Sequence, residues 1–189
     1  MRMIRIYFEG DRRLREGLRE FLKVEVDLAV GRKIKVDFVG AGKKQADQAC
    51  SNGQKDYPKA YPFILKDAEG PLPRHRPKHT YYWVEVMESW FLADRDAIAK
   101  ALGSCVKVRS LPNPSNVEQI AKARVFKLLS ASTRPCGQEK HYDDSHPPLL
   151  AGRIFQVLDR EKVKAKSTEC RRFLGALNEI ILKLAPETS

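Results

Sequence analysis

Four acidic residues stand where short apolar runs of the chain end. Glu9 closes the run over residues 2–8, Asp67 and Glu69 follow the run over 61–65, and Glu88 follows the run over 81–87. Carboxylates at the ends of parallel strands meet at one edge of the sheet, where they repel one another unless a cation lies between them. Mg²⁺ and Mn²⁺ take hard oxygen ligands, and Mg²⁺ keeps several waters, so two or three carboxylates suffice. The sequence therefore predicts a site for Mg²⁺ or Mn²⁺ whose catalytic and ligating residues are Glu9, Asp67, Glu69 and Glu88.

Each of these acids also has an ordinary structural explanation. Glu9 can be a solvated strand end, and the Asp67–Gly70 stretch can be a common turn. Glu88 can be an acid of a first helical turn, where the helix dipole favours it. The shared position of all four at one sheet edge favours the functional interpretation. Asp94 precedes a fresh helical pattern and is interpreted as an N-cap rather than a ligand.

The charge of the chain points to polyanionic partners. Its 189 residues carry 35 Lys and Arg against 24 Asp and Glu, a net charge of +11. Such an excess favours nucleic acid, DNA or RNA, as a partner. Residues 71–79 are basic and rich in proline, and we expect Arg74, Arg76 and Lys78 to contact phosphates there. The alternative for this loop is a solvated surface stiffened by its prolines.

The elements that must position these residues alternate between strand and helix in the first half. Alternating apolar residues predict strands at residues 2–8 and 33–39, and short apolar runs predict strands at 61–65 and 81–87. Helical spacing predicts a helix over 11–23 that Asp11 caps. This alternation indicates βαβ crossovers and a mainly parallel four-stranded sheet flanked by helices. The second half reads as helices, with a capping box at Ser115 and Glu118, an apolar pattern over 149–158 and an amphipathic last helix over 173–184.

This pattern predicts an α/β protein with an α/β core over residues 1–104 and a helical extension over 105–189 that packs on the core as one unit. The apolar stretches are too short to span a membrane, and an acid comes too early for a signal peptide. We therefore expect a cytoplasmic protein without membrane contact. Free thiols are then the expected state of the four cysteines, and Cys136 with His141 and His146 reads as a loop rather than a metal site.

The motifs around the acids resemble Toprim domains, the metal-binding domains of topoisomerases, primases and the overcoming-lysogenization-defect nucleases. Glu9-Gly10 after the first strand resembles their E-G motif, and Asp67-Ala68-Glu69 resembles their D-x-D motif. Residues 87–94 resemble the M-E-x-W-F-L-x-D signature of an uncharacterised bacterial family with a Toprim-like (Rossmann-like) fold, and similarity continues around Leu111-Pro112, 117–122 and 170–174. The second acid of the D-x-D motif is Glu69 here, and Lys66 precedes the motif.

The resemblance implies a metal-dependent nuclease that hydrolyses phosphodiesters, with a role in genome defence and an ATPase partner. The alternative is a catalytically silent nucleic-acid-binding or adaptor subunit that keeps the fold and the charge. A Rossmann-type nucleotide-binding protein is disfavoured, because no G-x-G-x-x-G follows the first strand and no P-loop motif occurs.

Overall fold

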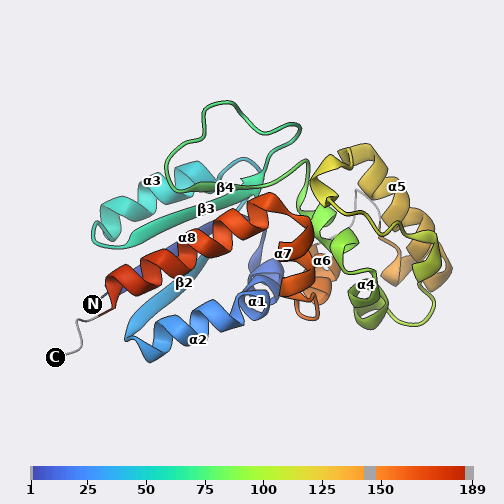
Figure 1. Ribbon diagram of the computed structural model, residues 1–189, viewed down its shortest axis with the longest axis horizontal. Coiled ribbons are helices and arrows are strands. Elements are labelled where there is room, and N and C mark those ends of the chain that lie inside the picture. The colour runs from blue at the N-terminus through green and yellow to red at the C-terminus, as the bar shows by residue number, and fades with distance from the viewer. Residues whose placement is uncertain (1, 143–147, 186–189) are drawn as a thin grey trace.

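Four parallel strands form one sheet in the computed structural model, which describes residues 2–142 and 148–185 (Figure 1). The strands are β1 (Arg2–Glu9), β2 (Ile34–Ala41), β3 (Tyr61–Asp67) and β4 (Thr80–Trp83), in the spatial order β2-β1-β3-β4. Phe8 lies beside Leu65, and Asp67 lies beside Trp83. The predicted α/β class is confirmed, and the three strand pairings are all parallel.

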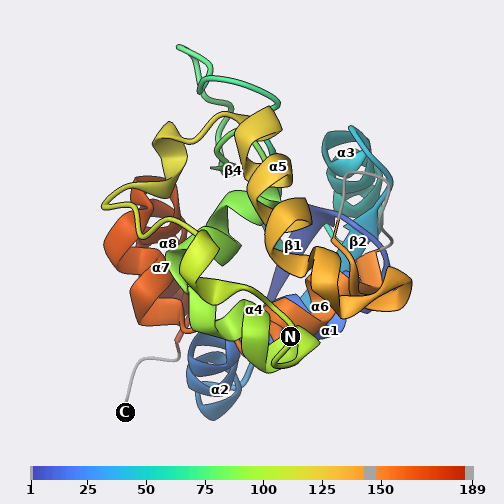
Figure 2. The same cartoon turned by 90° about the vertical axis from the view of Figure 1, so that its right-hand side faces the viewer.

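Helices cover both faces of the sheet. One face is covered by α3 (Ala46–Asp56), and the other is covered by α1 (Arg12–Phe21), α2 (Lys23–Gly31) and α8 (Thr168–Leu184) (Figure 1). The remaining helices gather beyond the carboxyl edge of the sheet, which faces the viewer in Figure 2. They are the 3₁₀ helix η1 (Met87–Ala93), α4 (Arg95–Leu102), η2 (Val108–Ser110), η3 (Val117–Gln119), α5 (Lys122–Thr133), η4 (Arg134–Cys136), η5 (Gln138–Lys140), α6 (Pro148–Phe155) and α7 (Arg160–Lys166).

The alternation of β1 separates two apolar clusters. Ile4, Ile6 and Phe8 belong to the large core on the α1 and α8 side, whereas Tyr7 belongs to a small cluster under α3. The large core is continuous between residues 1–104 and 105–189: Phe173 of α8 packs edge-on against Phe63 of β3, with ring centroids 6.0 Å apart. The last helix therefore returns to the sheet and closes its open face.

Helices α1 and α6 approach each other through two glycines. A Cβ on Gly17 would lie 2.3 Å from the carbonyl oxygen of Gly152, and a Cβ on Gly152 would lie 2.4 Å from the carbonyl oxygen of Arg13. Only a residue without a side chain fits at either position. This contact brings α6 against the first helix, next to the carboxyl edge of β1.

Several local predictions are confirmed and others are wrong. Asp11 caps α1 by accepting from the backbone N–H groups of Arg13 (2.8 Å) and Leu14 (3.3 Å), as the sequence predicts. Residues 68–79 contain neither helix nor strand, as predicted for the surface loop. The fourth strand ends at Trp83 rather than 87, because Glu85 takes a left-handed φ of 63° and η1 follows. Helices α2 and α7 are not predicted by the sequence pattern.

The predicted capping box at Ser115 and Glu118 is wrong, whereas Asp94 occupies the predicted N-cap position of α4 without a capping hydrogen bond from its side chain. Asn116 rather than Ser115 caps η3, with Oδ1 accepting from Glu118 N at 2.8 Å, and α5 begins only at Lys122. The carboxylate of Glu118 instead accepts from Glu169 N at 2.7 Å, at the start of α8. The side chain of Asp94 makes no cap to α4. It is buried and pairs with Lys162 Nζ at 2.7 Å, because α7 packs against the end of η1.

The prediction of four free thiols is wrong for two of them. Cys105 and Cys136 form a disulfide with their Cα atoms 5.0 Å apart, whereas Cys50 and Cys170 are free and buried. The fold brings the pair together by packing the turn after α4 against the end of α5. The bonded Cys136 is no metal ligand, and His146 lies outside the described residues. In residues 2–142 and 148–185, none of the helices combines the length and apolar character needed to cross a membrane.

Candidate functional site

Glu9 reaches the carboxyl edge of the sheet because the chain turns sharply behind it. Gly10 has a φ of 151°, and its N–H donates to the carbonyl of Ala41 at 2.8 Å. A Cβ at this position would lie 2.3 Å from Leu14 Cδ2, so glycine alone permits the turn into α1. The carboxylate of Glu9 accepts from the backbone N–H of Lys44 at 2.9 Å. The Glu9-Gly10 pair therefore has a geometric basis.

Asp67 is anchored where β3 ends. Its Oδ1 accepts from the backbone N–H of Met87 at 2.8 Å, which joins β3 to the first turn of η1. The next residue along the chain, Ala68, still donates to Trp83 of β4 at 2.9 Å. The carboxylate of Asp67 is thus held at the junction of the sheet and the 3₁₀ helix.

Glu88 is held by a residue from the far part of the chain. The hydroxyl of Tyr142 donates to Glu88 Oε1 at 2.9 Å, and Tyr142 itself is only 3% exposed. Its ring packs edge-on against Phe91 of η1, with centroids 6.0 Å apart. Tyr142 lies in the stretch where the sequence pattern is weakest, and no motif marks it as a site residue.

A cavity of about 740 Å³ collects these side chains at the carboxyl edge. Its polar lining includes Glu9, Asp67, Glu88, Lys122 and Tyr142. A smaller neighbouring cavity of about 280 Å³ is also lined by Glu9 and Asp67, together with Lys44, Lys66 and Glu69. The structure therefore brings three of the four predicted acids to one cavity: Glu9 and Asp67 from the ends of β1 and β3, and Glu88 from η1.

Burial is the main reason that the pKa values of the three acids in the cavity are raised. Burial raises the pKa of Asp67 to about 8, and the negative charges of Glu88 and Glu9 add to this despite the hydrogen bond from Met87. Burial also raises the pKa of Glu9, against the opposing effect of the Lys44 N–H. The pKa of Glu88 is raised as well, again mainly by burial. Desolvated carboxylates that repel one another form a site that a cation stabilises.

Glu69 does not share this environment. It has a left-handed φ of 55°, and its backbone N–H donates to the carbonyl of Glu85 at 3.1 Å. Its carboxylate pairs with Lys122 Nζ at 2.8 Å and Lys43 Nζ at 3.1 Å, and the hydrogen bond from Lys122 is the main reason its pKa is lowered. Glu69 lines the smaller cavity and is absent from the lining of the larger one.

Lys122 is a site residue that the sequence pattern does not mark. It is the first residue of α5, and its backbone N–H donates to Glu85 Oε2 at 3.0 Å. Its ammonium group pairs with Glu69, and the charges of Asp67 and Glu88 contribute to raising its pKa. Lys122 follows Glu69 by 53 positions, and no motif links the two. Lys43 joins it at the cavity from the turn that follows β2.

Strand alternation explains why the acids do not converge on one point. Glu9 falls on the α3 side of the sheet with Tyr7, whereas Asp67 falls on the opposite side with Leu65. Within residues 2–142 and 148–185, no group of three or more His, Cys, Asp or Glu side chains is arranged to hold a metal ion. Glu9 and Asp67 meet only because both lie at the last position of their strands.

The basic loop divides into two kinds of residue. Arg74 and Lys78 are exposed and point to solvent from the 68–79 loop. Arg76 instead pairs with Glu169, which is buried in α8 with 1% of its surface exposed. Arg172 pairs with the same carboxylate at 2.9 Å. Arg76 therefore fastens the loop to the last helix.

No protein-family model, no curated protein and no solved structure matches the chain. Its function is accordingly inferred from the geometry and electrostatics of the cavity.

Proposed function

We propose that the protein is a metal-dependent phosphodiesterase acting on nucleic acid. The observation that carries the proposal is the cavity at the carboxyl edge, which is lined by Glu9, Asp67 and Glu88 and where burial, with a further contribution from the charges of neighbouring acids, raises the pKa of Asp67 to about 8. The Toprim resemblance of Glu9-Gly10 and Asp67-Ala68-Glu69 supports the same assignment.

The donor set fits Mg²⁺ or Mn²⁺. Carboxylate oxygens are the ligands these ions prefer, and Mg²⁺ is commonly held by one or two carboxylates together with substrate phosphates. Two acids therefore suffice, and Glu9 and Asp67 are the pair that lines both cavities. Glu88 supplies a third negative charge behind them. A bound ion of this kind lowers the pKa of a water and stabilises the charge of a leaving oxygen.

Basic side chains at the cavity and on the 68–79 loop are proposed to bind the phosphates of the substrate. The ammonium groups of Lys43 and Lys122 lie at the cavity and are positioned to bind phosphate oxygens. Glu69 holds both of them and so belongs to the phosphate-binding part rather than to the ligand set. The exposed Arg74 and Lys78 extend the positive surface along the loop and favour binding of a polyanion.

The second candidate is a catalytically silent nucleic-acid-binding or adaptor subunit. It is favoured by the pairing of Glu69 with two lysines, which removes one acid of the D-x-D motif from the cavity. Such a subunit keeps the basic surface but cleaves nothing. The proposals of an ATPase partner and of a role in genome defence rest on the family resemblance.

A cleavage assay tests the proposal. Wild type is incubated with single- and double-stranded DNA and RNA in Mg²⁺, in Mn²⁺ and in EDTA, and compared with Glu9→Gln. Wild type is expected to cleave only with a metal, and Glu9→Gln is expected to lose activity by hundreds-fold or more, since stabilisation of the transition state by a metal amounts to several kcal/mol.

The matched control is Glu16→Gln, which removes the same charge from an exposed position of α1. This variant is expected to cleave like wild type. Cleavage by Glu9→Gln at the wild-type rate would put the active site elsewhere. Salt-sensitive binding without cleavage of any substrate would favour the silent subunit.

A further inference from the structure

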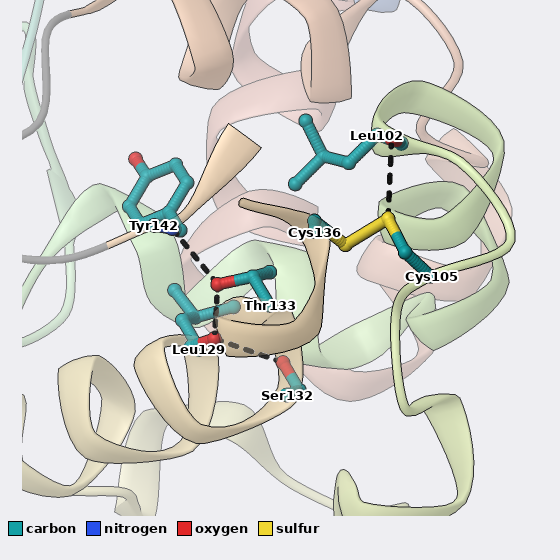
Figure 3. Close-up of a disulfide and its surroundings, with 7 residues drawn as sticks. All are labelled: Leu102, Cys105, Leu129, Ser132, Thr133, Cys136 and Tyr142. Carbon is teal, nitrogen blue, oxygen red and sulfur yellow. Dashed lines mark hydrogen bonds between the residues drawn. A yellow bond between two sulfur atoms is a disulfide. The ribbon is translucent and has the colours of Figure 1, made fainter. Parts of the chain in front are cut away.

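One cysteine of the disulfide, Cys136, precedes the cavity residue Tyr142 by only about six positions in the sequence. The disulfide joins Cys105, in the turn after α4, to Cys136 at the end of η4 (Figure 3). Both cysteines are half-buried, so a small thiol can reach them, whereas Cys50 and Cys170 are buried. The Sγ of Cys105 lies 3.8 Å from the carbonyl oxygen of Leu102. This oxygen is in place to accept the proton of a reduced Cys105 thiol.

A short chain of contacts leads from the disulfide to Tyr142. Cys136 ends η4, the short helix that follows α5. In the last turn of α5, Thr133 Oγ1 donates to the carbonyl of Leu129 at 2.8 Å and accepts from the backbone N–H of Tyr142 at 2.8 Å (Figure 3). Residues 137–141 between the two ends contain one 3₁₀ turn, η5. Isolated 3₁₀ turns are weakly stabilised on their own. The covalent bond constrains this segment at its Cys136 end, and the contact between Ser130 Oγ and His141 Nε2 at 3.3 Å holds it near Tyr142.

The far end of the segment enters the cavity. Tyr142 lines it, packs on Phe91 and donates to Glu88 Oε1 at 2.9 Å. A displacement of the 134–142 segment moves this hydroxyl away from Glu88. The disulfide and the cavity are thus coupled through Thr133 and Tyr142.

We propose that Cys105–Cys136 is a thiol-reducible tether that holds the Tyr142 hydroxyl on Glu88, so that the redox state of the pair regulates the cavity. The reductant is a dithiol: one of its thiolates attacks a sulfur of the Cys105–Cys136 bond and releases the other cysteine as a thiolate. Its second thiolate then attacks the mixed disulfide and releases the remaining cysteine. The products are two cysteine thiols and the disulfide of the reductant, with two electrons and two protons transferred. Disulfides in reducing compartments are most often redox-sensing or catalytic, which suits this role.

The structural part of the proposal is tested by hydrogen exchange of the full chain, with and without dithiothreitol. Reduction is expected to speed amide exchange in a peptide covering 134–142 by about tenfold or more and to leave α8 unchanged. Cys105→Ser is expected to reproduce the reduced state without the reductant. Cys50→Ala removes a cysteine outside the tether and is expected to respond like wild type. Intact mass with thiol labelling establishes the oxidised state first.

The regulatory part rests on the proposed function and is tested by Mn²⁺ affinity. Reduction is expected to change the affinity of wild type several-fold, while Tyr142→Phe, which keeps the ring on Phe91, loses this response but keeps the exchange response. Four free thiols in air-oxidised protein, or unchanged exchange at 134–142 on reduction, would overturn the tether. An exchange response without Mn²⁺ binding would count against the metal site and leave the tether standing. Mn²⁺ binding that ignores reduction would overturn the regulation alone.

Discussion

The ammonium group of Lys122 lies 2.8 Å from Glu69 Oε2, so that a lysine at the start of α5 neutralises the second acid of the D-x-D motif. Lys43 pairs with the other oxygen of the same carboxylate at 3.1 Å. Glu69 thereby holds two cations at the cavity whose acids are Glu9, Asp67 and Glu88. Asp67 and Glu69, which are separated by one residue in the sequence, therefore differ in the fold: the pKa of Asp67 is raised and that of Glu69 is lowered.

Glu69→Gln is expected to weaken substrate binding more than metal binding. The substitution removes the charge that positions Lys43 and Lys122, so KM for nucleic acid should rise roughly tenfold while Mn²⁺ affinity stays within about threefold of wild type. Steady-state kinetics and Mn²⁺ titration measure the two effects. A decrease in Mn²⁺ affinity as large as that of Glu9→Gln would return Glu69 to the ligand set.

Asp67→Asn is expected to stabilise the metal-free protein at neutral and alkaline pH. The pKa of Asp67 is raised from 3.8 to about 8 in the folded state, so the folded state binds the proton more tightly than the unfolded chain. The free energy of unfolding therefore falls between about pH 4 and pH 8, by up to about 1.4 kcal/mol per pH unit. Asn cannot titrate, and its oxygen can still accept from Met87 N.

Thermal melts in EDTA from pH 4 to pH 9 measure this difference. The gap between Asp67→Asn and wild type should be small at pH 4 and largest above pH 8. Parallel melting curves over the whole range would show that the carboxyl group of Asp67 is not perturbed by its neighbours.

Within the basic loop, Arg74 and Lys78 are expected to contribute to nucleic-acid binding, whereas Arg76 is expected to contribute to stability. Neutralising Arg74 and Lys78 together should flatten the dependence of affinity on salt, by up to about 0.9 in the logarithmic slope for each duplex phosphate that the protein no longer neutralises. Arg76→Gln should instead lower the free energy of unfolding by about 1–3 kcal/mol, because it removes one partner of the buried Glu169. Binding titrations at several salt concentrations and denaturant melts distinguish these outcomes. An unchanged slope for the double variant would remove the loop from the binding face.

Two glycine-to-alanine substitutions in helices are expected to have opposite signs. Gly17→Ala should lower the free energy of unfolding by about 1–3 kcal/mol, because its Cβ would lie 2.3 Å from the Gly152 carbonyl. Gly175→Ala in α8 meets no atom within 4 Å and should stabilise by about 0.5–1 kcal/mol through helix propensity. Urea denaturation compares them. Equal effects would mean that α1 and α6 are not in close contact.

Periodicity predicts the elements whose apolar residues face the core. The four strands and α8 follow this rule, with Phe173, Leu177 and Ile181 buried along one face of the helix. Helix α7 is not predicted by periodicity, because Val163 is its only buried residue and its neighbours are mostly charged. Helix α2 is not predicted by periodicity either, because its exposed residues Val24 and Val30 interrupt the pattern of apolar residues on one face.

Two acids of the cavity, Glu9 and Asp67, are predictable from sequence because each is the last residue of its strand, whereas Glu88 reaches the same cavity from η1. Contacts that only the tertiary structure creates cannot be predicted from the sequence. Lys122, Tyr142 and the disulfide partner of Cys105 each lie far along the chain from the groups they contact. Their positions depend on how α5 packs beyond the carboxyl edge, and no local pattern encodes that packing.

The central claim, a metal held by Glu9 and Asp67, is tested most directly by anomalous diffraction from crystals soaked in Mn²⁺. The account predicts an anomalous peak in the cavity at the carboxyl edge, within direct ligand distance, about 2.0–2.2 Å, of a carboxylate oxygen of Glu9 or Asp67. Crystals of Glu9→Gln soaked in the same way should lack the peak. An empty cavity in the wild type at millimolar Mn²⁺, or a peak bound by other residues, would contradict the account and leave the silent subunit as the better description.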